Sequence, residues 1–192
     1  MRRTLLSIVG AAVLAASLAS PAAAQRPQTR RGFWIGFGFG GGTLGWDCDA
    51  CTRQSEGGPT AFVRLGGTTS DKVLLGAEVN TWTLDIGAAI ITAGVTVFSV
   101  NWYPSATGGL FLKGGLGASL YNRETGSTNA TASSGGILLG VGYDIRVATN
   151  MSITPMLTVW GAGKADLKDG ATTIQTGLSH NAATLQLGLT FH

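Results

Sequence analysis

The stretch that decides the fold is residues 181–192, NAATLQLGLTFH, in which two kinds of side chain alternate. Ala, Leu and Phe occupy every second position, and Thr, Gln and Gly fill most of the positions between them. Successive side chains of a β-strand point to opposite faces, so this pattern predicts a strand with one apolar face and one polar or small face. The strand reaches an aromatic residue, Phe191, as we expect of a strand that closes a sheet against the first one.

Seven earlier segments repeat this alternation, and no stretch after the first 31 residues shows helical periodicity. They are residues 32–43, 59–69, 73–83, 90–103, 109–122, 135–147 and 151–163. The face of the fourth segment is ambiguous, and we expect Phe98, Val100 and Trp102 to point outward. Pro155 lies inside the seventh segment, where a closed barrel offers no edge strand to hold it, so we expect a bulge there.

The connections between the eight predicted strands alternate in length. Tight turns lie near Ser70, at residues 104–108 and at residues 148–150. The intervening loops are mostly longer, at residues 44–58, 123–134 and 164–179, with 84–89 the shortest of that set. Short turns at one end and longer loops at the other are typical of outer-membrane barrels, in which the short turns face the periplasm.

The composition indicates which face of the barrel meets lipid. Of the 192 residues, 12% are charged and 30 are glycine, against about 25% charged residues in soluble domains. The positions between the apolar ones are mostly Gly, Ser and Thr, which suit a narrow interior better than a water-facing surface. Residues 32–192 are therefore predicted to be an all-β, eight-stranded antiparallel up-and-down transmembrane β-barrel. A soluble lipocalin-like carrier, with the apolar face inside, is the alternative.

The first 24 residues have the pattern of a signal peptide. Arg2 and Arg3 precede an apolar core, and three alanines end the segment before Gln25. We therefore expect cleavage after residue 24 and export to the bacterial outer membrane. Residues 25–31 then form a short polar N-terminal segment, in which we expect Arg26, Arg30 and Arg31 to be solvated. The remaining chain has 11 basic and 10 acidic residues, which leaves no basic surface for nucleic acid.

Five charged residues fall on the polar faces of the predicted strands. Arg64 and Glu78 are equally far from the turn at Asp71, so we expect them to face each other. Lys113 and Asp144 fall at similar depth on neighbouring strands, which predicts a second ion pair. Arg146 is expected nearer the periplasmic mouth. Buried charges persist when they are paired, and these pairs either plug the barrel or gate a narrow channel for water, ions or small solutes.

Cys48 and Cys51 lie three positions apart, at the two ends of CDAC in a predicted loop. Disulfides form in exported proteins, so we expect these cysteines to form a local disulfide. A redox motif would require a βαβ context, which the sequence lacks. A metal site would require further ligands, and Asp47 and Asp49 are the candidates nearby, so no metal site is predicted.

The sequence offers no convincing catalytic or cofactor-binding residues. Gly36, Gly38 and Gly41 match GxGxxG, but no βαβ unit surrounds them, so no dinucleotide cofactor is expected. Ser179 adjoins His180, yet adjacent residues of a strand point to opposite faces, which is poor geometry for a nucleophile and its base. A lipid-modifying barrel enzyme is therefore the less favoured alternative.

Four features of the sequence together resemble one known family. They are the leader, the eight alternating strands, the opening GFWIGFGFGGG at residues 32–42 and the aromatic Phe191. The chain resembles the small outer-membrane β-barrel family typified by the OmpA transmembrane domain and OmpX, over residues 32–192. The resemblance implies a monomer surrounded by outer-membrane lipids and lipopolysaccharide. It also implies that Phe191 is the signal read by the barrel-assembly machinery.

The expected function is a structural or surface-interaction role in the envelope, with the narrow channel as the alternative. The basic residues of the longer loops are candidates for contact with lipopolysaccharide phosphates or surface partners. They are Arg53, Arg123, Lys164 and Lys168.

Overall fold

The computed structural model describes residues 30–192, and the predicted signal peptide and Arg26 lie outside them. That part of the chain forms ten strands. They are β1 (Phe33–Asp47), β2 (Gln54–Ser70), β3 (Val73–Ile86), β4 (Ala89–Trp102), β5 (Leu110–Thr125), β6 (Thr128–Tyr143), β7 (Ile145–Ala148), β8 (Met151–Ala162), β9 (Ala165–Asp169) and β10 (Thr172–Phe191). No helix in residues 30–192 is long and apolar enough to cross a membrane.

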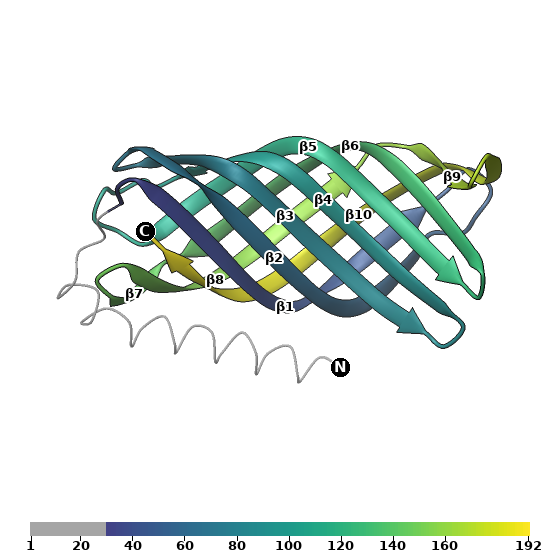
Figure 1. Ribbon diagram of the computed structural model, residues 1–192, viewed down its shortest axis with the longest axis horizontal. Helices are drawn as coiled ribbons and strands as arrows, with labels where there is room; N and C mark the ends of the chain where they lie inside the picture. The colour runs from purple at the N-terminus through teal and green to yellow at the C-terminus, as the bar shows by residue number, and fades with distance from the viewer. Residues whose placement is uncertain (1–29) are drawn as a thin grey trace.

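The strands form a closed antiparallel ring (Figure 1). β7 continues β6 along β8, and β9 continues β8 between β6 and β10, so the ten strands occupy eight positions. β1 pairs with β10 from Ile35↔Phe191 to Asp47↔Ser179, which closes the ring. The prediction of an eight-stranded antiparallel up-and-down barrel is therefore confirmed.

The two ends of the barrel differ. We call the terminal end the one where β1 begins, β10 ends and residues 71–72, 103–109 and 149–150 connect the strands. The distal end carries the connections 48–53, 87–88, 126–127 and 170–171. Figure 1 shows β9 and the tip of the β5–β6 hairpin at the distal end, opposite the C-terminus.

The apolar side chains face outward over the middle and the terminal end of the barrel. Phe39 is 77% exposed and Leu116 69%, and Phe98, Val100 and Trp102 are exposed as predicted. The alternate positions point inward and are buried, many of them polar. An outward apolar band is what a barrel needs in lipid, and a soluble lipocalin-like carrier would have the opposite arrangement.

The distal hairpins are more regular than predicted. Gly126 is the first residue of the β5–β6 turn, and Gly170 is the first residue of the β9–β10 turn. Their φ angles are +59° and +57°, a left-handed conformation that favours glycine. Most of the predicted loops 123–134 and 164–179 is therefore strand. The prediction was wrong because it followed outward apolar residues, whereas these strands continue past the apolar band with mostly polar outward residues and with apolar residues such as Leu167 and Leu178 pointing inward.

The bulge predicted at Pro155 does not occur. The register between the neighbouring strands keeps one offset from Gly142↔Met156 to Ile145↔Ile153, on either side of this residue. Instead, the break between β6 and β7 falls at Asp144, across from Pro155 and Thr154. Proline has no N–H to donate to a ladder, and this interruption accommodates it without an extra residue.

Two apolar clusters fill the interior. The distal cluster includes Leu44, Trp82, Tyr121, Leu138 and Trp160, and the terminal cluster consists of Trp34, Phe62, Leu74, Tyr103, Phe111 and Met156. The glycines of β1 make room for side chains from other strands. A Cβ on Gly36 would lie 2.8 Å from Arg64 Nε, so the glycine allows this arginine to enter the lumen.

Candidate functional site

The predicted charges line the interior, but their pairing differs from the prediction. Arg64, Glu78, Lys113 and Asp144 are each at most 4% exposed. Arg64 and Glu78 are opposite each other in the β2–β3 register, as expected. However, Lys113 Nζ contacts Glu78 Oε1, and Arg64 Nη2 lies 3.9 Å from Asp144 Oδ1.

The predicted pairs Arg64–Glu78 and Lys113–Asp144 are therefore wrong. Lys113 pairs in register with Gly140, four residues before Asp144, so these two charges do not lie at the same depth. Long side chains in a narrow lumen also meet partners across it as readily as along the sheet. The two pairs thus exchange partners while every predicted charge stays inside.

The first pair lies among polar side chains of β3 and β5. Asn80 Nδ2 donates a hydrogen bond of 2.6 Å to Glu78 Oε1, the same oxygen that Lys113 contacts. All three side chains are buried. A buried carboxylate is costly unless it is both paired and hydrogen-bonded, and Glu78 has both kinds of contact.

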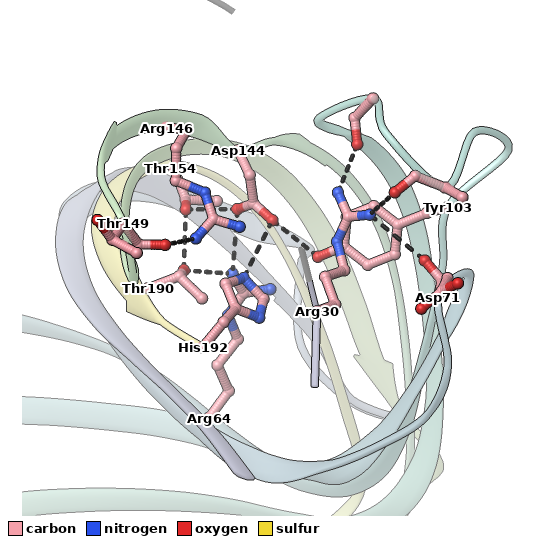
Figure 2. A network of polar contacts seen from close by, with 12 residues as sticks. Arg30, Arg64, Asp71, Tyr103, Asp144, Arg146, Thr149, Thr154, Thr190 and His192 are labelled. Atoms are coloured by element: carbon pink, nitrogen blue, oxygen red, sulfur yellow. Dashed lines mark hydrogen bonds and ion pairs between the residues drawn. The ribbon is translucent and has the colours of Figure 1, made fainter. Parts of the chain in front are cut away.

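The second pair belongs to a network at the terminal end (Figure 2). Asp144 accepts hydrogen bonds from Tyr103 Oη at 2.8 Å and Thr154 Oγ1 at 2.7 Å. Arg64 Nη2 donates to Thr190 Oγ1 at 2.8 Å, and His192 Nε2 lies 3.6 Å from Asp144 Oδ2. Asp144, at the break between β6 and β7, is thus the centre of a network that joins β2, β8 and the last residue of the chain.

Arg30 covers this network, contrary to the prediction that it is solvated. Its side chain is 1% exposed, and its guanidinium carbon lies 3.4 Å from the centroid of the Tyr103 ring. It donates hydrogen bonds to the backbone oxygens of Asp71 at 3.4 Å, Ala106 at 3.1 Å and Gly108. These carbonyls belong to two different turns, so one side chain ties both turns across the terminal mouth.

Arg31 and Arg146, the other two arginines near this mouth, differ from Arg30 in their contacts. Arg31 is exposed, as expected. Arg146 lies at the same mouth as Arg30 (Figure 2), where its Nη1 donates to Thr149 O at 2.6 Å. Arg146 thus lies near this mouth, as expected. The sequence did not predict its hydrogen bond to a carbonyl of the β7–β8 turn.

The distal end is held together by the disulfide loop. Cys48 and Cys51 form the predicted disulfide. The Asp49 N–H donates to Thr176 O at 3.3 Å, and Lys164 Nζ lies 2.7 Å from the Asp49 carboxylate. This hydrogen bond raises the pKa of the Lys164 ammonium. These contacts dock the loop on β10. Residues 30–192 contain no group of three His, Cys, Asp or Glu side chains suited to a metal ion.

His180 meets a serine other than the one considered from the sequence. Its Nε2 lies 2.9 Å from Ser119 Oγ, across the lumen between β10 and β5. The Ser119 hydroxyl donates its single proton to Gly94 O at 2.7 Å, so it accepts from the imidazole. Tyr121 and Trp160 pack on the imidazole with centroid distances of 5.5 and 5.8 Å. The contact is a buried hydrogen bond and not a nucleophile–base pair, because the serine proton is directed at Gly94 O.

No family model and no curated protein sequence matches the chain, but solved structures do. Neisserial surface protein A is similar at 12% identity and a TM-score of 0.61, over 85% of this chain and 99% of that one. Ail, the attachment invasion locus protein of Yersinia pestis, solved with the heparin analogue sucrose octasulfate, is similar at 9% identity and a TM-score of 0.56, over 85% and 100%. At such identities the likeness concerns the fold. The chain therefore has the fold of the small outer-membrane β-barrel proteins.

Proposed function

We propose that this protein is a sealed outer-membrane barrel with a structural or surface-interaction role, and that it does not conduct solutes. The observation that supports the proposal is the filled interior. Ring side chains of Trp82, Tyr121 and Trp160 are buried in the distal half, and those of Trp34 and Phe111 in the terminal half. An eight-stranded barrel has room inside for little more than its own side chains.

The charges support the same proposal. A conducting lumen would keep its charges in water, whereas Lys113 and Glu78 contact each other directly and are buried. Arg30 lies across the terminal mouth and is itself buried. Side chains in such contacts fix the strands to one another. Of the two roles that the sequence allowed for the charged pairs, plug or gate, this supports the plug.

The distal end is the surface that we assign to contacts outside the cell. Such barrels have short periplasmic connections and longer extracellular projections. The distal hairpins extend past the apolar band, so we assign the distal end to the outside. The distal end carries seven acidic and four basic side chains, a net charge of −3. They are Asp47, Asp49, Glu56, Asp85, Glu124, Asp166 and Asp169, and Arg53, Arg123, Lys164 and Lys168. This sign favours a cationic partner and opposes a polysulfated one such as the heparin analogue bound to Ail.

Planar-bilayer recording tests the sealed barrel. Protein that migrates as a folded, SDS-resistant barrel before boiling should give no steady conductance. A reproducible single-channel current from the same preparation would overturn the proposal in favour of the narrow channel.

Cell binding tests the surface role. Replacement of Glu124, Asp166 and Asp169 by their amides should reduce attachment of expressing cells to a cationic surface. The double variant R123Q/K168Q is the matched control and should increase attachment. Equal attachment of all variants, at equal amounts of folded barrel, would refute a role for distal charge.

A further inference from the structure

The disulfide loop at the distal end borders a hollow of about 370 Å³. One wall of the hollow consists of Cys48, Ala50 and Cys51, and the other consists of residues 173–176 near the start of β10. All of these lining residues are uncharged. A small molecule in this hollow would therefore lie directly against the disulfide.

Gln175 directs a hydrogen-bond donor at the two sulfurs. Its Nε2 contacts Cys48 Sγ, and Cys51 Sγ lies 3.2 Å from the same nitrogen. The β9–β10 ladder shifts register on both sides of Gln175, and bulges of this kind re-aim a side chain. The irregular strand thus turns the carboxamide out of the ladder and toward the disulfide.

The charges around the loop are matched by opposite charges. Gly177 has a φ of +67°, and a Cβ on this residue would collide with the Asp49 carboxylate, so the glycine lets the carboxylate approach β10. Lys164 Nζ lies 2.7 Å from this carboxylate. The next position of the β1–β2 register places Asp47 opposite Arg53. A thiolate that approaches the loop therefore does not meet an unmatched negative charge at either aspartate.

The two sulfurs differ in access and in contacts. Cys48 is only 9% exposed, whereas Cys51 is more exposed. An external nucleophile therefore reaches Cys51 more easily, and Cys48 becomes the leaving group. Thiol–disulfide exchange is faster when the leaving thiolate has a lower pKa, and a hydrogen bond to the charged form lowers a pKa. The Gln175 carboxamide is placed to donate that hydrogen bond to Cys48.

We propose that this loop is a site of thiol–disulfide exchange with small external thiols. The thiolate of such a molecule attacks Cys51 Sγ, the Cys48–Cys51 bond breaks, and Cys48 Sγ leaves with the electron pair and takes a proton from water. A second thiolate then attacks the small-molecule sulfur of the mixed disulfide, and Cys51 Sγ leaves and is protonated. The two cysteines are thereby reduced while two thiols are oxidised to a small disulfide, and the reverse sequence oxidises the loop again.

This site differs from the redox motif that the sequence argued against. In proteins with that motif, a helix N-terminus can stabilise the thiolate, whereas here the donor is a side-chain amide on an irregular strand. The inference goes beyond the proposed function, because neither conductance nor charge-dependent attachment involves the sulfurs.

The test uses the folded, oxidised protein in detergent micelles, with reduced glutathione as the small thiol. Acid quenching and alkylation of free thiols trap the mixed disulfide, and fragmentation of the peptide that contains both cysteines shows which sulfur carries glutathione. We expect glutathione on Cys51. Q175L, which lacks the N–H donor, should form the mixed disulfide about tenfold more slowly, the effect of losing one hydrogen bond. Q54L removes a distal glutamine outside the hollow and should react like the wild type.

Three results would overturn the proposal. The folded wild type could form no mixed disulfide, glutathione could be attached to Cys48, or Q175L could react as fast as the wild type. The first two results need no variant, so the test stands even if Q175L does not fold into an SDS-resistant barrel. The conductance and attachment experiments would be unaffected by any of these results.

Discussion

The replacement R30A removes the side chain that covers the terminal mouth, and its effect on stability follows from the contacts of that side chain. The guanidinium donates to three carbonyls in two turns and stacks on Tyr103. A hydrogen bond to a charged group contributes about 1.5–3 kcal/mol, and a cation–π contact about 1 kcal/mol. Water reaches the freed carbonyls at the mouth and replaces most of the lost bonds. We therefore expect a loss of about 3 kcal/mol, well below the sum of the separate contacts.

The assay is reversible urea unfolding of the barrel folded into lipid vesicles, followed by tryptophan fluorescence. R31A is the matched control, because Arg31 is the next residue and is exposed. It should change the free energy of unfolding by less than about 0.5 kcal/mol. R30K should lie between the two, since lysine keeps the charge but lacks the planar fork that reaches several carbonyls at once.

The reasoning fails if R30A and R31A unfold with the same free energy. It also fails if R30K is as stable as the wild type, because a charge alone would then suffice and the three carbonyl contacts would contribute nothing. If only R30A loses stability and the barrel still does not conduct, Arg30 stabilises the two turns without being needed to close the lumen.

Three further predictions concern other contacts. K113M leaves the Glu78 carboxylate buried without its cation and should cost about 3–5 kcal/mol, whereas the double variant K113M/E78L should recover most of this loss in the same urea assay. C48S/C51S opens a very short loop and should lower stability by less than about 2 kcal/mol, while limited proteolysis at residues 48–53 becomes faster; unchanged proteolysis would contradict the docking described for this loop. S119A removes a buried hydrogen-bonded hydroxyl and should cost about 1–2 kcal/mol without altering the lipid A composition of the membrane, and an altered composition would revive the lipid-modifying enzyme.

The fold could be predicted because lipid imposes one face on every strand. A period of two assigns each side chain to one side of the wall, so the outward position of Phe98 and the inward positions of Arg64 and Asp144 follow from counting. The same rule explains why the interior charges were found. It carries no information on which of them meet, because that depends on the register of neighbouring strands and on the reach of side chains across the lumen.

Other features had no periodic signal at all. Arg30 precedes β1 by three residues, and its partners are backbone oxygens of distant turns, which the sequence cannot rank. The Ser119–His180 contact joins positions 61 residues apart across the lumen. The hairpin strands beyond the apolar band were missed because the outward apolar residues, on which the prediction relied, end at the boundary of the band.

The seam between β1 and β10 has a consequence for how the protein is made. Its thirteen residue pairs join the first strand to the last, and Ile35 pairs with a residue 156 positions later. Until the last strand arrives, its two neighbours β1 and β8 expose unpaired N–H and C=O groups, which hydrocarbon does not tolerate. The whole chain must therefore be synthesised before the barrel can be stable in lipid. We therefore expect insertion to be all-or-none, and a chain truncated before its final strand should be degraded instead of accumulating as a shorter barrel.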